Sequence, residues 1–136
     1  MAENMEELRK KFIVEEQLDE KKLSEYIERT LRFGRVSLDG GIIIDKENMS
    51  TKDQIGLALV MRFLANRLEK GISAEVNVKD LAQYIGIPED QVAARLADLK
   101  EDKVAIRIDK GVYKANSLQI RKFLDDLENK YGVLSK

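Results

Sequence analysis

Hydrophobic residues recur over residues 6–33 at the three- and four-residue spacing of amphipathic helices, in two separate stripes. The stripes consist of Leu8, Phe12 and Ile13 and then of Leu23, Tyr26, Ile27, Thr30 and Leu31. Asp19 is expected to cap the second helix at its start, and Gly34 is expected to close it. The segment RVSLDGGIIID that follows predicts a β-hairpin with its turn at the Gly40-Gly41 pair.

The longest predicted helix begins after Ser50 and ends at Gly71. Ser50 and Asp53 have the spacing of a capping box, with Asp where Glu is preferred. The apolar residues of this helix cover more than one of its faces: Ile55, Leu57, Ala58, Val60, Met61, Phe63, Leu64 and Leu68. A helix with so little polar surface belongs to a protein core or to a dimer interface.

Two short helices with a glycine-containing turn between them are predicted over residues 77–101. A short strand ends around Val76, and Asn77 caps a helix that Gly86 stops. Pro88 occupies the favoured first position of the second helix. The inward stripes are Val78, Leu81, Ala82 and Ile85 on the first helix and Val92, Leu96 and Leu99 on the second. This spacing is typical of a helix-turn-helix.

Residues 104–115 predict a second hairpin, because apolar and polar positions alternate along its first strand. The expected inward residues are Val104, Ile106 and Ile108, and the expected outward residues are Ala105, Arg107 and Asp109. Asp109-Lys110-Gly111 suits a tight turn with glycine in the left-handed conformation. A last helix, capped by Asn116 or Ser117 and followed by Gly132, then carries Leu118, Ile120, Phe123, Leu124 and Leu127.

The composition narrows the range of possible functions. Of the 136 residues, 43% are hydrophobic and 36% are charged, which is too apolar for a disordered chain and too charged for a membrane protein. Cysteine and histidine are both absent. Disulfides and thiolate metal sites are therefore excluded, and the side chain most used for proton transfer near neutral pH is missing. We expect no enzymatic activity, no metal and no cofactor.

The charge distribution divides the chain near residues 46–50. Residues 1–49, an expected helical arm and hairpin, hold nine basic and 12 acidic residues, whereas residues 50–136, the expected main domain, hold 15 basic and 13 acidic residues. The net charge of -1 does not by itself indicate nucleic-acid binding. We expect a cytoplasmic protein, because no apolar run has the length of a signal peptide or a membrane span. Abundant Lys, Glu, Arg and Ile are typical of proteins from hot environments.

Two polar clusters at the first hairpin have simpler explanations than a ligand site. The Gly40-Gly41 pair lacks the Lys-Ser/Thr and the following helix of a phosphate-binding loop. The possible oxygen ligands of a calcium or magnesium ion follow the spacing of no familiar metal loop: Asp39, Asp45, Glu47 and Asn48.

The order helix, strand, helix, helix, hairpin, helix over residues 51–131, with LAQYIGIPEDQVAARLADLKEDKVA at its centre, resembles the winged helix-turn-helix regulators common in archaea and bacteria. The resemblance implies a mainly α fold with small β elements (α+β), in which a winged helix-turn-helix carries an N-terminal helix and β-hairpin extension. It also implies that a recognition helix, residues 88–101, enters the major groove of double-stranded DNA while the hairpin, or wing, lies on phosphate or in the adjacent minor groove.

The resemblance assigns roles to individual residues. In the recognition helix, Gln91 and Arg95 are the outward residues best able to contact base edges, since Arg can bind guanine and Gln can bind adenine through paired hydrogen bonds. The remaining expected contacts are to the DNA backbone, from Lys100 at the end of that helix and from Lys103, Arg107, Lys110 and Lys114 of the wing. Binding as a homodimer is expected, because one short helix reads only a few base pairs.

Acidic residues in the recognition helix favour an alternative to DNA binding. Glu89, Asp90 and Asp98 would repel phosphate, although the first two also stabilise the start of a helix through its dipole. The basic residues could equally form an ordinary solvated surface. The alternative hypothesis is therefore a non-catalytic winged-helix module that binds another protein instead of DNA. A contiguous basic surface favours DNA, and an exposed apolar surface favours protein.

Overall fold

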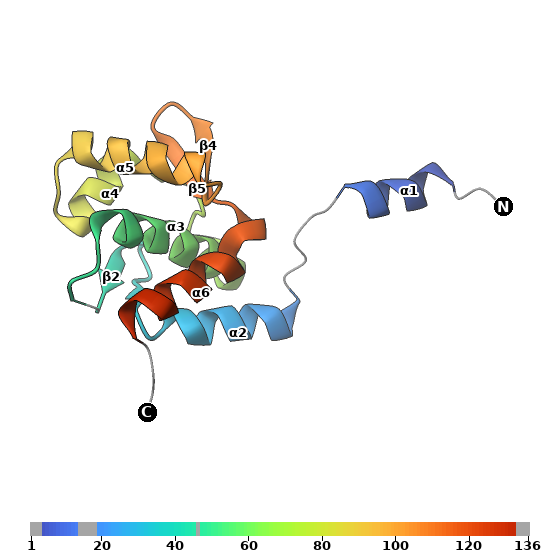
Figure 1. The fold of residues 1–136 in the computed structure, drawn as a ribbon, viewed down its shortest axis with the longest axis horizontal. Coiled ribbons are helices and arrows are strands. Elements are labelled where there is room, and N and C mark those ends of the chain that lie inside the picture. The colour runs from blue at the N-terminus through green and yellow to red at the C-terminus, as the bar shows by residue number, and fades with distance from the viewer. Residues whose placement is uncertain (1–3, 14–18, 46, 133–136) are drawn as a thin grey trace.

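The computed structural model describes residues 4–13, 19–45 and 47–132. These residues form helices and two small antiparallel sheets (Figure 1), which confirms the expected α+β class. The elements are α1 (Met5–Phe12), α2 (Glu20–Thr30), β1 (Gly34–Val36), β2 (Ile42–Ile44), α3 (Thr51–Leu68), β3 (Val76–Asn77), α4 (Val78–Ile85), α5 (Glu89–Glu101), β4 (Ala105–Asp109), β5 (Val112–Ala115), the 3-10 turn η1 (Ser117–Gln119) and α6 (Ile120–Tyr131). In these described ranges, every helix is too short or too polar to cross a membrane.

Helix α3 lies at the centre of the fold because the middle of the helix is apolar on all of its faces. The Ser50 hydroxyl oxygen accepts a hydrogen bond from the Asp53 N–H at 3.1 Å and so caps the helix, as its sequence predicts. Every residue from Ile55 to Met61 is buried, which leaves no solvent face over two turns. In Figure 1, α4 and α5 lie on one side of α3, and α2 and α6 lie on the other. The prediction of a core helix is confirmed.

Helices α4 and α5 form the predicted pair. The Asn77 side chain accepts a hydrogen bond from the Asp80 N–H at 2.7 Å, and Gly86 ends α4 in the left-handed conformation with φ of 82°. Helix α5 buries Val92, Leu96 and Leu99, as its stripe predicts. The prediction for Pro88 is wrong by one position, because its extended backbone makes it the N-cap of α5 and not the first helical residue.

Strands β3, β5 and β4 form an antiparallel sheet in that order, so β4 is an edge strand. Gly111, with φ of 71°, makes the predicted left-handed turn between β4 and β5. The predicted alternation along β4 is wrong: Ala105 is 3% exposed, whereas Ile106 and Ile108 are 39% and 41% exposed. Ala105 pairs with buried Ala115, so these two share the inward face, and the next residue faces away from the core.

Three predicted helix boundaries also differ from the structure. Helix α2 ends before Gly34 because a turn brings Phe33 into the core, and Gly34 begins β1. Helix α3 ends before Gly71, in a turn stabilised by a hydrogen bond from the Asn66 side chain to the Ile72 carbonyl at 2.8 Å. Helix α6 begins only after η1, which leaves Leu118 48% exposed.

The N-terminal and C-terminal parts contribute to one hydrophobic cluster. Tyr26 of α2 and Phe33 are fully buried in the same cluster as Leu124 of α6. Arg29 of α2 donates hydrogen bonds to Glu128 at 2.8 Å and to Asp125 at 2.6 Å, both on α6. The pKa of Arg29 is raised, mainly by the hydrogen bond to Glu128. The domain boundary between residues 49 and 50 stays a prediction, but residues 20–45 pack closely on the second part.

Candidate nucleic-acid interface

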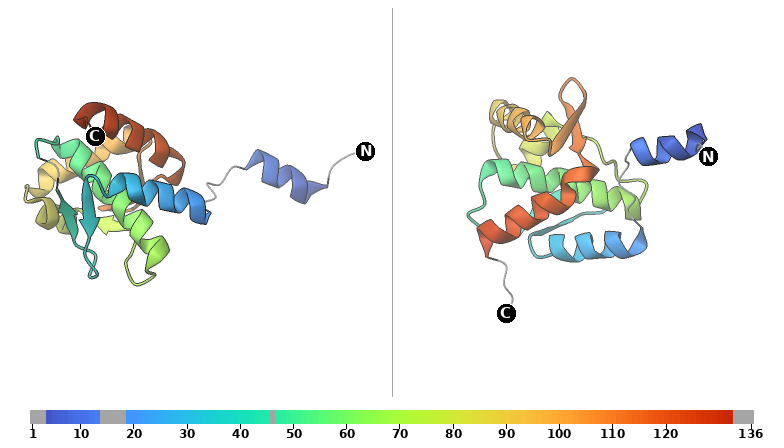
Figure 2. Two further views of the ribbon diagram at one scale, coloured as in Figure 1. Left: turned by 90° about the horizontal axis from the view of Figure 1, so that it is seen from below. Right: turned by 45° about the vertical axis from the view of Figure 1, so that its right-hand side comes forward.

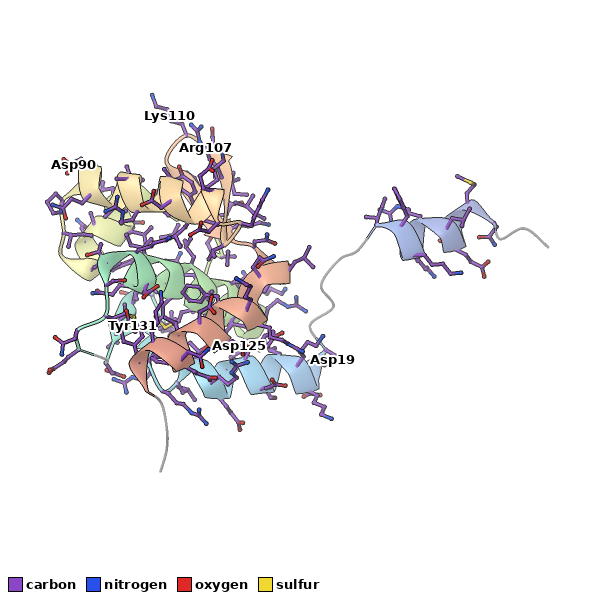
Figure 3. The ribbon with its side chains drawn as sticks, viewed as in Figure 1. Asp19, Asp90, Arg107, Lys110, Asp125 and Tyr131 are labelled. Atoms are coloured by element: carbon purple, nitrogen blue, oxygen red, sulfur yellow. The ribbon has the colours of Figure 1, made fainter. Side chains whose placement is uncertain are left out.

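Helix α5 and the β4–β5 hairpin lie side by side and form the surface that the sequence predicts to contact DNA. Figure 3 shows Arg107 and Lys110 extending from the hairpin away from the body, with Asp90 near the opposite end of α5. The candidate side chains of this surface are exposed or half-buried: Gln91, Arg95, Lys100, Lys103, Arg107, Lys110 and Lys114. None of them belongs to the hydrophobic core.

The helical phase of α5 separates its three candidate residues. Arg95 follows Gln91 by four positions and therefore lies on the same side of the helix. Lys100 follows Gln91 by nine positions, which at about 100° per residue places it on the opposite side. Gln91 and Arg95 can thus contact one surface together, whereas Lys100 faces a different direction.

Arg95 already has a partner on its own helix. Its Nε donates a hydrogen bond to Oδ2 of Asp98 at 2.9 Å, and both side chains are nearly half exposed. Because the pair is in contact with water, it is weak, on the order of 0.5 kcal/mol. A phosphate or a base could therefore displace Asp98 at little cost, but Asp98 neutralises part of the charge that Arg95 offers.

The charge of the candidate surface is unevenly divided. The outward side of α5, opposite Val92, carries Asp90 and Glu101 with Ala94 between them. The wing and the turn before it, residues 103–115, hold four basic residues and one acidic residue. Positive charge is therefore concentrated on the wing, and the middle of α5 offers carboxylates and alanine methyl groups.

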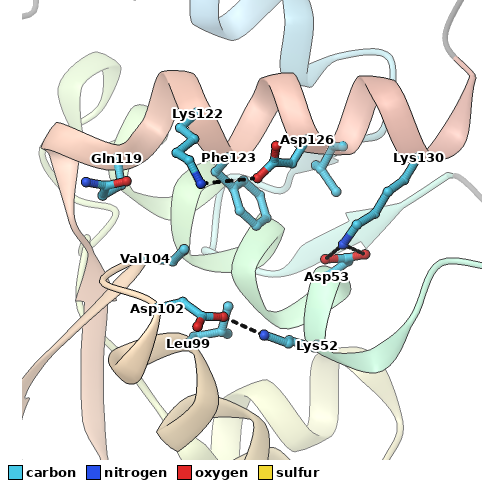
Figure 4. A pocket seen from close by; sticks show the side chains of 11 residues that line it. Lys52, Asp53, Leu99, Asp102, Val104, Gln119, Lys122, Phe123, Asp126 and Lys130 are labelled. Carbon is cyan, nitrogen blue, oxygen red and sulfur yellow. Dashed lines mark hydrogen bonds and ion pairs between the residues drawn. The ribbon is translucent and has the colours of Figure 1, made fainter.

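A cavity of about 360 Å³ lies between the start of α3, the end of α5 and α6 (Figure 4). Ion pairs from these helices line it, between Lys52 and Asp102 at 2.5 Å, between Lys130 and Asp53 at 3.2 Å, and between Lys122 and Asp126 at 3.9 Å. The three positive and three negative charges balance. The cavity therefore has no excess charge to attract an ion. The Lys52–Asp102 and Lys130–Asp53 pairs connect the start of α3 to the end of α5 and to α6.

This cluster cannot be predicted from the sequence because most of its contacts join distant parts of the chain. The Tyr131 hydroxyl donates a hydrogen bond to Oδ2 of Asp53 at 2.6 Å and accepts one from the Ser50 N–H at 3.1 Å. Only the four-residue spacing of Lys122 and Asp126 is a local signal. Tyr131 thus connects the end of α6 to the start of α3 through these two hydrogen bonds.

The carboxylates of the first hairpin stabilise its turn. The Ser37 hydroxyl and then the Gly41 N–H donate hydrogen bonds to Asp39, and these bonds lower the pKa of Asp39. Asp45 pairs with Arg35 at 3.4 Å. Within the described residues, no three acidic side chains lie close enough to hold a metal ion.

Comparisons with models of known protein families, with curated proteins and with solved structures gave no match to this chain. The positions, contacts and charges of α5 and the wing are therefore the basis on which a function can be assigned. The strongest of these features is a basic hairpin beside an exposed helix.

Proposed function

We propose that this chain is a winged-helix protein that binds double-stranded DNA as a homodimer in the cytoplasm, with no catalytic step, metal or cofactor. The element order from α3 to β5 and the strand order β3-β5-β4 support a winged helix, because they set a helix-turn-helix beside a β-hairpin. One observation carries the proposal: exposed or half-exposed basic residues gather on the hairpin and the turn before it, next to α5, at Lys103, Arg107, Lys110 and Lys114.

In this proposal the wing supplies affinity and α5 supplies selectivity. Arg107 and Lys110 contact backbone phosphates, which hold the protein on the duplex without reading its sequence. Gln91 and Arg95 contact base edges from the same side of α5. The Asp90 carboxylate is repelled by phosphate. The side of α5 that carries Gln91 and Arg95 must therefore face the groove. A homodimer places two copies of α5 on the duplex, so the number of base pairs that are read is doubled.

The double variant Arg107→Ala with Lys110→Ala should lose most of the DNA affinity. Each phosphate contact contributes about 0.9 to the slope of log affinity against log salt concentration, so the slope should fall by about two. Fluorescence anisotropy with a labelled mixed-sequence duplex, measured over a salt series, gives both quantities.

The matched control is Arg32→Ala with Lys122→Ala, which removes the same two charges from exposed positions on the α2 and α6 side of the molecule. This control should keep the affinity within about twofold of the unmodified protein, since exposed charges this far apart are screened by salt. If both double variants weaken binding equally, the wing is not the contact surface. If the folded protein binds no duplex even at low salt, the proposed function is wrong.

Asp98→Asn should strengthen DNA binding by about threefold to tenfold and make the salt slope steeper by up to about one. The change removes a carboxylate from the surface and releases the Arg95 guanidinium from its 2.9 Å contact. Asp126→Asn is the control, because it also breaks a pair with a cation on its own helix but lies on α6. A similar gain in both variants would show that only the net charge matters.

A second candidate function is binding to another protein through the same surface. The observation that favours it is the outward position of Ile106 and Ile108 on an edge strand, beside an acidic helix. The same titration separates the two functions, because a protein-binding module shows no salt-dependent affinity for duplex DNA.

A further inference from the structure

Helix α1 has an apolar stripe, made of Met5, Leu8 and Phe12, that no described part of the chain covers. The N-terminus of this helix is capped, since the Asn4 side chain accepts a hydrogen bond from the Glu7 N–H at 2.8 Å. Yet Met5 is 79% exposed and Phe12 is 88% exposed, and none of the eight residues of the helix is buried. Helices shorter than about 12 residues are marginal in water, so α1 needs a surface on which to pack.

A groove of suitable character lies between α2, β1 and the second half of α3. It has a volume of about 330 Å³ and a mainly apolar lining that includes Ile27, Leu31, Val36, Met61, Leu64 and Leu68. Leu31 and Leu68 are 54% and 66% exposed. A folded monomer gains nothing by leaving two such leucines in water beside an apolar groove.

The charges beside the stripe and the groove are complementary. Arg9 of α1 lies next to Met5 and Phe12 in helical phase, which places its guanidinium along one side of the apolar stripe. Glu69, directly after α3, is the acidic residue of the groove lining. The other charged lining residue, Arg35, is already paired with Asp45. A helix docked in the groove can therefore bring Arg9 toward Glu69.

We propose that two copies of this chain exchange these helices, so that α1 of each copy docks in the apolar groove of the other. In the structure α1 stands apart from the body of its own chain (Figure 2), which leaves the groove of that chain open. The segment that joins α1 to α2, residues 13–19, spans at most about 25 Å, which limits the exchange to a closely packed pair.

Reciprocal exchange is a closed two-fold arrangement that covers both stripes and both grooves. It uses a common mode of recognition, an amphipathic helix in an apolar groove. The proposal rests on the homodimer of the proposed function but does not depend on DNA binding, so the oligomeric state can be measured without DNA.

The test is sedimentation equilibrium of the unmodified chain and of two variants, Phe12→Glu in the stripe and Leu68→Glu in the groove. Both positions are largely exposed, so the folded structure should persist, and circular dichroism checks this. Each variant should weaken the dimer by at least about 30-fold, because a charge replaces a large apolar side chain at the contact. Leu38→Glu, at a position 81% exposed on the first hairpin and outside the groove, should leave the dimer unchanged.

Mixing the two variants distinguishes exchange from other dimers. In the mixed dimer the Leu68→Glu copy supplies an intact α1 and the Phe12→Glu copy supplies an intact groove, so one of the two contacts is restored and association should recover in part. Because the chain has no cysteine, Leu8→Cys in one copy and Leu31→Cys in the other should form a disulfide-linked pair only in the mixture.

Three other results would overturn the proposal in distinguishable ways. A dimer that Phe12→Glu breaks and Leu68→Glu leaves intact means that two α1 helices pair with each other. A dimer that neither variant affects keeps the homodimer but rejects any role of α1. A chain that remains monomeric at concentrations of about 100 μM removes both the exchange and the homodimer, while DNA binding remains a separate question.

Discussion

Arg62→Met is expected to lower the free energy of unfolding by about 4 kcal/mol. Arg62 is 7% exposed and donates hydrogen bonds to three backbone carbonyls, those of Ser73 at 2.7 Å, Gly40 at 3.0 Å and Glu75 at 3.4 Å. Methionine keeps much of the buried carbon chain but leaves these carbonyls without their donor. The first hairpin and the segment before β3 then lose these hydrogen bonds to α3.

Equilibrium unfolding in urea, followed by circular dichroism, measures this loss as a lower midpoint at an unchanged slope. Arg62→Lys should recover only part of it, because one ammonium cannot reach three carbonyls as a planar guanidinium does. Arg107→Met is the control, since the same change at an exposed wing residue should alter stability by less than about 0.5 kcal/mol. A loss below about 1 kcal/mol for Arg62→Met would mean that water replaces the guanidinium at these carbonyls.

Gly34→Ala is expected to destabilise the fold by about 3 kcal/mol. A Cβ atom at this position would lie 2.4 Å from the Ile43 carbonyl oxygen and 3.2 Å from the Ile44 Cα. Both neighbours are backbone atoms of the paired strand β2, so no side-chain rotation can relieve the contact, and the two strands must move apart. A glycine in a strand often marks such a close backbone approach.

Gly71→Ala provides the comparison, because a Cβ there meets no atom within 4 Å. Removing a flexible glycine from the unfolded chain should make this variant equal to the unmodified protein or up to about 1 kcal/mol more stable. Thermal unfolding of the two variants side by side measures the difference. Equal melting temperatures for both alanine variants would contradict the close approach of β1 and β2.

The sequence predicts the elements whose signals are local. Asn77 and Gly86 lie at the two ends of α4 and were enough to define it, and Val92, Leu96 and Leu99 gave the buried face of α5. Gly111 marks the turn of the wing, but the alternation along β4 does not show which of its two faces is inward, because the small Ala105 is the residue that packs on the core. Ile106 and Ile108 are apolar in sequence and exposed in the structure for that reason.

The interactions that hold the parts together could not be predicted in the same way. Arg62 is satisfied by carbonyls of residues 40, 73 and 75, and nothing near it in sequence indicates a buried charge. The arrangement of the candidate interface, in contrast, is predictable from local spacings. The sequence contains both the three-residue spacing of Arg95 and Asp98 and the helical phase that separates Lys100 from Gln91. The period of an α-helix alone predicts that Lys100 and Gln91 lie on opposite sides of α5.

The central position of α3 affects how the chain can be synthesised without aggregation. Its apolar surface leaves the ribosome before α4, α5 and α6, the helices that cover most of it, have been made. The segment from α2 to β2 has already been made at that moment, and it contributes Tyr26 and Phe33 to the hydrophobic cluster. Its helix α2 lies on the side of α3 that faces away from α5 (Figure 1). Residues 20–45 can therefore shelter the nascent helix and reduce the time in which other unfolded chains could bind it.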